Sequence, residues 1–288
     1  MIYILLIILL ILIISVVAFS WMIARISQTP KREKITTTPN HPYININIPS
    51  NGGTLKGWLI NQSTISPLII LVHGWGSSRN TMIRYIDRLY QEGYSLLLFD
   101  IRSHGESDGV KALTVKTFKD DVIEVIKFAN SQLNMEKGNI GILGHSFGGF
   151  GSLLALKEDL PVKVIITDSS PVSFKTIMQA YFNKYKLPKF LIPIVTRICF
   201  LRARIKIKEV KNDLDVLKVL KNNLNKPPIL MAHSKNDGFV PYHEMEKVTK
   251  KFPEIKKLYL NCKGHRKSET DPAFWREIIP FLNQHLKH

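Results

Sequence analysis

The first two dozen residues form an almost unbroken apolar run. Positions 1–24 are almost purely Ile, Leu, Val and aromatic residues, with a few Ala and Met, and Ser15 and Ser20 are the polar residues among them. A helix of about 22 residues rises about 33 Å, which is enough to cross the hydrocarbon core of a bilayer. Trp21 falls near the end of the run, where interfacial aromatic residues are common. We therefore expect residues 1–24 to be a transmembrane anchor.

Two other interpretations of this run stay open. A cleaved signal peptide is one, although the run has no Lys or Arg before it, is long for a signal core, and is not followed by a clear small-residue cleavage site. A buried core helix is the other, and it fits poorly because the run is apolar on every face. Residues 25–42 follow as a linker rich in Thr, Pro and Lys. Their basic residues predict, by the positive-inside rule, a single-pass protein with its large domain on the cytoplasmic side.

Beyond residue 42 the pattern alternates between short apolar runs and longer amphipathic stretches. We expect strands at 43–48, 54–60, 68–72, 95–100, 139–143, 162–167, 228–232 and 257–261, and helices near 79–92, 116–134, 148–158, 243–251 and 271–286. Several runs, such as 68–72, are apolar throughout, which is typical of strands buried on both faces of a parallel sheet. Residues 43–288 are therefore predicted to form one α/β domain with helices on both faces of a mostly parallel sheet.

One connection is much longer than the others. About sixty residues separate the strands ending near 167 and starting at 228, and Pro188 and Pro193 interrupt them. We interpret residues 170–226 as a mainly helical, basic lid insertion, with an ordinary long helical connection as the alternative. Six aromatic residues of this segment could line an acyl pocket or simply pack within the lid: Phe174, Tyr181, Phe182, Tyr185, Phe190 and Phe200.

Charge and composition limit the partners. The formal net charge is +17, and all of it lies after residue 24. A basic protein can bind nucleic acid, an anionic membrane or an acidic substrate, but no nucleic-acid-binding motif is present. Cys199 and Cys262 lack metal-type spacing, and residues 243–246 lack the second histidine of a zinc helix. We expect no metal, no cofactor and no nucleic acid, and the sequence does not indicate the oligomeric state.

The sharpest motif is Gly-His-Ser-Phe-Gly-Gly at residues 144–149. It follows an apolar strand and precedes a predicted helix, which is the context of a nucleophile elbow. Glycines two residues before and after the serine leave room for neighbouring backbone, and the helix offers its N-terminus to developing negative charge. Ser146 is the predicted nucleophile.

A second motif, His-Gly-Trp-Gly-Ser-Ser at residues 73–78, directly follows the strand at 68–72. A glycine-bounded turn there can aim the backbone N–H of Trp75 at the same point as the N–H of Phe147. Two such donors stabilise the oxyanion of a tetrahedral intermediate. We expect His73 to support this loop rather than to react.

A nucleophilic serine needs a base and an orienting acid. Asp237 lies in a turn after the strand at 228–232, and His265 lies just past the last strand, so the order Ser, Asp, His matches that of α/β-hydrolases. Asp168, at the end of another strand, is the rival acid. Among the other histidines, His145 is expected to face away from the serine hydroxyl and His233 to lie in a loop.

Together these segments resemble the α/β-hydrolase superfamily over residues 43–288. Residues 73–78, 100–107 and 144–149 look like the branch that holds lysophospholipase-like and serine aminopeptidase-like hydrolases. The resemblance implies an eight-stranded sheet and a cofactor-free serine mechanism, and it implies a structural turn at 100–107.

The resulting hypothesis is a membrane-anchored serine hydrolase. Ser146 attacks the carbonyl of an ester, Asp237 orients His265, and the substrate is a small-molecule or lipid-like acyl ester. A serine peptidase, amidase or thioesterase on the same three residues is the first alternative, because this scaffold supports many reactions. A non-catalytic, membrane-tethered binding protein is the second.

Overall fold

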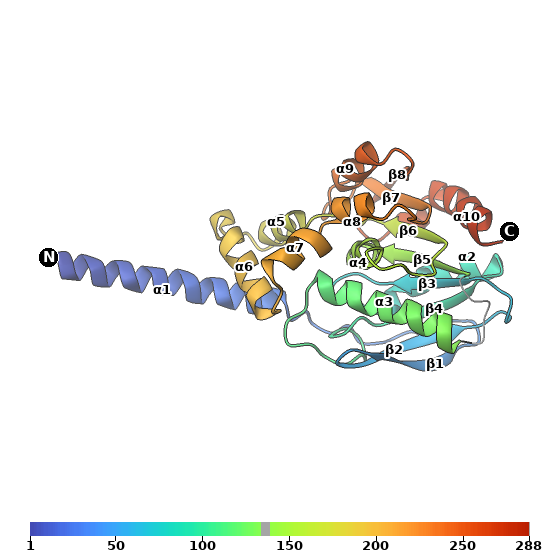
Figure 1. Cartoon of the computed structure of the whole chain (residues 1–288), viewed down its shortest axis with the longest axis horizontal. Coiled ribbons are helices and arrows are strands. Elements are labelled where there is room, and N and C mark those ends of the chain that lie inside the picture. Colours follow the sequence, from blue (N-terminus) through green and yellow to red (C-terminus); the bar gives the residue numbers. More distant parts are fainter. Residues whose placement is uncertain (134–138, 288) are drawn as a thin grey trace.

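The structure, a computed structural model, describes residues 1–133 and 139–287, and it is built around one eight-stranded sheet (Figure 1). The strands stand in the order β1-β2-β4-β3-β5-β6-β7-β8. The first two pairings, β1 with β2 and β2 with β4, are antiparallel, and all the others are parallel. The strands are β1 (Ile44–Ser50), β2 (Gly53–Ile60), β3 (Leu68–Val72), β4 (Ser95–Phe99), β5 (Ile140–His145), β6 (Val164–Asp168), β7 (Ile229–Asn236) and β8 (Lys256–Lys263).

Helices cover both faces of the sheet, as the apolar strands predict. On β3, for example, Ile70 and Val72 contribute to one core and Ile69 and Leu71 to the other. The first face carries α3 (Val115–Gln132), α4 (Phe147–Ala155), α8 (Val216–Asn222) and α9 (His243–Lys251). The second carries a 3-10 helix (Arg79–Tyr85), α2 (Ile86–Gln91) and α10 (Pro272–Leu286). This is the α/β-hydrolase fold.

The predicted elements agree with the structure to within a few residues. All eight strands occur, and the largest difference is at β7, which extends to Asn236 instead of ending at residue 232. The extension corrects one expectation: His233 lies in a strand and is buried, not in a loop. The predicted helix at 79–92 is split into a 3-10 turn and α2. The last residue of the helix predicted at 116–134 lies outside the described residues.

The long connection between β6 and β7 forms four α-helices and a short 3-10 helix (Lys189–Leu191). The α-helices have two different roles. α5 (Phe174–Lys184), α6 (Ile192–Arg202) and α7 (Ile207–Asp213) lie beyond the ends of the strands, beside the base of α1 (Figure 1). α8 instead packs against α4 on the face of the sheet. The segment thus consists of an inserted helical part, α5 to α7, and a final helix, α8, that covers the sheet.

Helix α1 (Ile2–Ser27) projects away from the domain, and its last turns dock on α6 (Figure 1). Ile23 and Ala24 are buried there among α5 and α6 side chains. The Gln28 amide N–H donates to the carbonyl oxygen of Cys199 (2.9 Å), and Arg202 donates to the Gln28 side-chain oxygen (3.0 Å). The helix therefore continues three residues past the predicted anchor, and its end packs against α5 and α6 of the inserted helical part.

The segment expected to be a linker lies along the domain surface. Arg32 donates hydrogen bonds to the carbonyl oxygens of Gly105 and Ser107, and Ser78 donates to Glu33 (2.8 Å). Further along, Ile35 and Tyr43 pack against the second core. These contacts attach the segment to the domain, so it does not act as a free tether.

Candidate active site

The turn between β5 and α4 holds Ser146 in a conformation that few residues adopt. Its φ is 53° and its ψ is −122°, in a region that costs an L-residue about 1–3 kcal/mol. A Cβ on Gly144 would lie 2.5 Å from Gly149 Cα, and one on Gly148 would lie 2.2 Å from the Val72 carbonyl oxygen. Only glycine fits at either position, so the spacing of the motif has a steric origin.

Three predicted residues meet at this turn. The Ser146 Oγ lies 2.9 Å from His265 Nε2, and His265 Nδ1 lies 2.7 Å from Asp237 Oδ2. They come from the end of β5, from the loop after β8 and from the turn after β7. Asp237 is fully buried, whereas the His265 side chain is 17% exposed. The arrangement is that of a nucleophile, a base and an orienting acid.

The environment of Asp237 keeps it ionised. Burial alone would raise its pKa, but hydrogen bonds from His233 and His265 outweigh burial and hold the pKa below the usual range. Its Oδ1 also accepts the backbone N–H groups of Phe239 (2.8 Å) and Val240 (3.0 Å). His233, which sequence reasoning placed in a loop, lies on β7, the strand that leads into the Asp237 turn, and its Nε2 is 3.4 Å from Asp237 Oδ2. Its position four residues before Asp237 was the available signal in the sequence.

The predicted oxyanion loop reaches the serine. A Cβ added to Gly74 would lie 3.0 Å from Ser146 Cβ and 3.5 Å from its Oγ, so the turn after β3 passes directly beside Ser146. Trp75 and Phe147 line the same cavity as Ser146, and their rings are 4.9 Å apart. Both residues predicted to supply oxyanion donors therefore lie in the cavity that Ser146 lines.

Two buried histidines hold that loop in place. His73 Nε2 accepts the N–H of Ile101 (3.0 Å), and its Nδ1 donates to the carbonyl of Gly74 (2.7 Å). His104 Nε2 accepts the N–H of Gly76 (3.0 Å). His73 thus supports the loop, as expected, and residues 100–107 form the structural turn that the resemblance implied.

Asp168, the rival acid, faces a different set of partners. Its carboxylate accepts hydrogen bonds from Tyr85 (2.6 Å), from His145 Nδ1 (3.0 Å) and from Ser268. Burial alone would raise the pKa of Asp168. The hydrogen bond from His145 and the charge of the nearby Arg84 outweigh burial, so the pKa lies below its usual range. Through Ser268 the carboxylate fixes the loop that carries His265. The Asp168 backbone carbonyl oxygen also accepts the Ser146 backbone N–H (2.8 Å), so Asp168 holds the turn and the loop in shape.

The buried imidazoles predict a loss of stability in acid. Burial lowers the pKa of His73 to about 4 and of His104 and His145 to about 3, from 6.5. The unfolded chain therefore binds more protons below pH 6.5, and each histidine lowers the free energy of unfolding by about 1.4 kcal/mol per pH unit. Burial raises the pKa of Asp100 and Asp121, which offsets part of this loss.

Because three imidazoles act against two carboxyls, we expect a net fall in the free energy of unfolding as the pH drops below 6. Urea unfolding of the detergent-solubilised chain between pH 7.5 and 5 would measure it. A midpoint that does not move over this range would contradict neutral buried imidazoles.

A cavity of about 1150 Å³ opens over Ser146. Its walls come from the loops after β3, β5 and β8, from α5, and from residues 26–31 at the end of α1. Of the six aromatic residues considered for an acyl pocket, Phe174, Tyr181 and Tyr185 line it. Phe182 is instead buried against α1 and α6, and Phe190 is 72% exposed.

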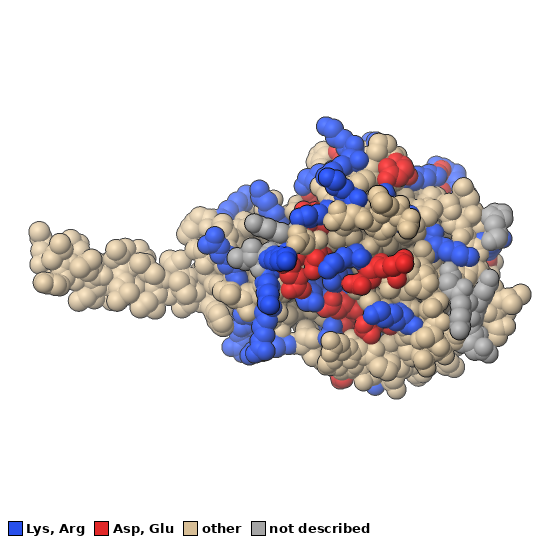
Figure 2. Space-filling model, viewed as in Figure 1, with Lys and Arg blue, Asp and Glu red and all other residues tan. Residues whose placement is uncertain are grey.

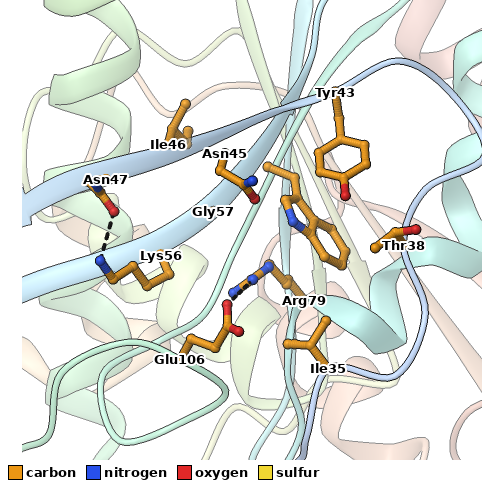
Figure 3. A pocket seen from close by; sticks show the side chains of 11 residues that line it. Ile35, Thr38, Tyr43, Asn45, Ile46, Asn47, Lys56, Gly57, Arg79 and Glu106 are labelled. Carbon is orange, nitrogen blue, oxygen red and sulfur yellow. Dashed lines mark hydrogen bonds and ion pairs between the residues drawn. The ribbon is translucent and has the colours of Figure 1, made fainter.

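A second cavity, of about 520 Å³, lies between the surface segment at 35–43 and the β1–β2 hairpin (Figure 3). The Arg79–Glu106 ion pair and Trp58, over which Arg79 stacks at 4.5 Å, form its floor. None of its lining residues belongs to the Ser146 cavity. Within the described residues, no group of three or more His, Cys, Asp or Glu side chains could hold a metal ion.

Comparisons with known proteins agree with this fold. The family model described as alpha/beta hydrolase fold matches residues 67–207. A Haemophilus influenzae protein named "Putative esterase/lipase" is 27% identical over 78% of this chain and 86% of its own length. An uncharacterized Bacillus subtilis protein is 28% identical over 77% of this chain and 73% of its own.

A solved structure of an esterase from Pyrococcus furiosus superposes with a TM-score of 0.71 at 23% identity, over 90% of this chain and 97% of that one. At this identity the likeness speaks for the fold alone. With the family match and the sheet topology, it places the chain in a defined class: the protein belongs to the α/β-hydrolase superfamily. The relatives named as esterases support a hydrolase of this fold.

Proposed function

We propose that the protein is a membrane-anchored serine hydrolase that cleaves carboxylic esters through an acyl-enzyme on Ser146. The observation that carries the proposal is the continuous hydrogen-bonded series from Asp237 through His265 to Ser146, with distances of 2.7 and 2.9 Å, at the floor of a large cavity. The His265 side chain stays 17% exposed in that cavity, which a purely structural cluster would not need.

The proposed reaction has two steps. His265 Nε2 takes the proton from the Ser146 hydroxyl as Oγ attacks the ester carbonyl, and the N–H groups of Trp75 and Phe147 stabilise the oxyanion. His265 then passes the proton to the leaving alcohol. Water, activated by the same imidazole, attacks the acyl-enzyme and releases the acid. Asp237 keeps Nδ1 protonated throughout and stabilises the imidazolium.

Labelling by a fluorophosphonate probe tests this function, because the probe reacts with serines activated in this way. We expect the folded chain in detergent to be labelled, and Ser146→Ala to be unlabelled while keeping its circular dichroism spectrum. Ser152→Ala, which alters a serine on the same helix, is the matched control and should keep its label. Failure of the folded wild-type chain to react would favour a non-catalytic binding protein.

A substrate panel separates the enzyme alternatives. Hydrolysis of p-nitrophenyl esters would support the esterase, whereas exclusive cleavage of amino-acyl anilides or acyl thioesters would support the peptidase or thioesterase. The esterase proposal predicts turnover of the esters and their loss in Ser146→Ala.

The membrane part of the proposal is supported by α1. It is the one described helix long and apolar enough to cross a bilayer, and its most apolar window makes no buried contact. Lys and Arg side chains gather where the apolar helix meets the domain (Figure 2). Arg202 stacks over Trp21 at 5.3 Å at this junction. We place the domain on the cytoplasmic side, in line with the basic residues that follow the span.

Charges within α1 should release the protein from membranes. Each arginine near the middle of a span costs about 2.5–3.5 kcal/mol of insertion free energy. We expect Ile7→Arg, Ile11→Arg and Ile14→Arg together to move the chain from the carbonate-resistant pellet to the soluble fraction. The same three positions changed to leucine should leave it in the pellet. The intact mass of the purified chain tests the signal-peptide alternative, since cleavage would remove α1.

A further inference from the structure

The rim of the Ser146 cavity carries only positive charge. Five basic side chains line it, and among the described residues that line it there is no Asp or Glu. The five are exposed, and none forms an ion pair within the described part of the chain. They are Lys31, Lys184, Lys263, Arg266 and Lys267.

Four of these cations lie on the side of the cavity where the leaving group must depart. Lys263 is the last residue of β8, and Arg266 and Lys267 follow in the loop that carries His265. The Lys184 Nζ lies 6.0 Å from the centre of the Phe239 ring, and that ring packs edge-on against His265 at 5.3 Å. Because His265 gives its proton to the leaving atom, these cations surround the leaving group rather than the acyl group.

The deeper walls of the cavity are apolar. Phe147, Ile177 and Met178 are buried in its lining, and the Phe174 ring packs against Phe200 at 4.9 Å. At about 1150 Å³ the cavity exceeds the roughly 300–1,000 Å³ typical of small-ligand sites. Helix α5 spans both regions, since it begins with Phe174 and ends with Lys184. An amphiphile with an apolar body and an anionic end matches this division.

We propose that the substrate is an acyl ester or thioester whose leaving group carries a phosphate. This proposal rests on the hydrolase function above. The acyl chain lies against α5, and the phosphate lies between the loop at 263–267 and Lys184. Arg266 can hold a phosphate with two parallel hydrogen bonds, and the lysines add point charges.

The reaction needs no reagent besides water. Ser146 Oγ bonds to the acyl carbon as the bond from that carbon to the leaving oxygen or sulfur breaks. The serine proton passes through His265 to the leaving atom. The released alcohol or thiol keeps its phosphate, and hydrolysis of the acyl-enzyme yields the free acid.

The test uses the full chain in excess neutral detergent and substrates with one lauroyl group: lauroyl glycerol phosphate, monolauroyl glycerol, lauroyl lysophosphatidylcholine and lauroyl-coenzyme A. We expect kcat/KM for lauroyl glycerol phosphate or lauroyl-coenzyme A to exceed that for monolauroyl glycerol at least tenfold at low salt, with the advantage falling as salt screens the cations. Whichever of lauroyl glycerol phosphate and lauroyl-coenzyme A has the higher kcat/KM shows whether the phosphate comes from a lipid or from a thioester carrier. Lauroyl lysophosphatidylcholine, whose phosphate is neutralised by its own cation, should have a kcat/KM between that of monolauroyl glycerol and those of the anionic substrates.

Variants assign the preference to the loop. Arg266→Gln and Lys267→Gln should each reduce the ratio of anionic to neutral kcat/KM several-fold, and the exposed Lys250→Gln on α9 should leave the ratio unchanged. Equal kcat/KM for monolauroyl glycerol and both anionic substrates at low salt would overturn the proposal, as would a ratio insensitive to both loop variants. If p-nitrophenyl butyrate is cleaved but the lauroyl substrates show no preference for an anionic leaving group, only this inference fails. If neither labelling nor ester cleavage occurs, the hydrolase function itself fails.

Discussion

His265→Ala is expected to lower kcat for a carboxylic ester by about 10⁶-fold, with little change in KM. Without the imidazole the Ser146 hydroxyl has no base within hydrogen-bond distance among the described residues, and its proton has no path to the leaving group. In serine hydrolases, loss of the base costs about as much as loss of the whole triad. This corresponds to about 8 kcal/mol of transition-state stabilisation. Steady-state kinetics on p-nitrophenyl butyrate measures both constants.

The matched control is His243→Ala. His243 lies on α9 with its side chain 62% exposed and pairs only with Glu246, so its removal should leave kcat within twofold. A loss of less than a hundredfold in His265→Ala, with the protein folded, would mean that another group serves as the base.

Asp237→Asn is expected to lower kcat by about 10⁴-fold. Asparagine can still accept the N–H groups of Phe239 and Val240, so the turn should keep its shape. Its amide, however, no longer favours the tautomer of His265 that accepts the serine proton, and it cannot stabilise the imidazolium. The loss should appear in kcat rather than in KM, and near-unchanged thermal unfolding would show that the change is chemical.

Asp168→Asn separates the two candidate acids. Asp168 accepts hydrogen bonds from Tyr85, His145 and Ser268 and does not contact His265, so its loss should act mainly on stability. Disrupting a buried charged pair costs about 3–5 kcal/mol. We expect a clear fall in Tm and a loss in kcat far smaller than that of Asp237→Asn. The opposite order of kcat losses would make Asp168 the orienting acid.

Much of the fold follows from local patterns in the chain. The apolar run at 68–72 is buried on both faces because its alternate side chains enter the two cores on opposite sides of the sheet. The run at 1–24 can be recognised because an all-apolar helix cannot be covered by a domain of this size. The elbow can be recognised because a side chain at its glycines would clash with backbone a few residues away or on the adjacent strand.

Long-range contacts, in contrast, cannot be read from spacing. The sequence favours Asp237 as the acid but does not exclude Asp168, because the two residues lie at the carboxyl ends of the neighbouring parallel strands β7 and β6. The choice depends on which carboxylate the loop after β8 reaches, and Ser268 turns that loop so that His265 meets Asp237.

The sequence by itself determined the class of fold, the candidate nucleophile and base, and the apolar helix, because each depends on local periodicity or on sterically constrained spacing. Only the tertiary structure decided that the end of α1 docks on α6, that the segment after it lies along the domain, and that Asp237 is the acid beside His265. The physical reason is that these contacts join residues far apart in the chain, through loops whose path depends on packing. The cationic rim around the candidate active site arises in the same way, from the segment after α1, from α5, and from the end of β8 with the loop that follows it.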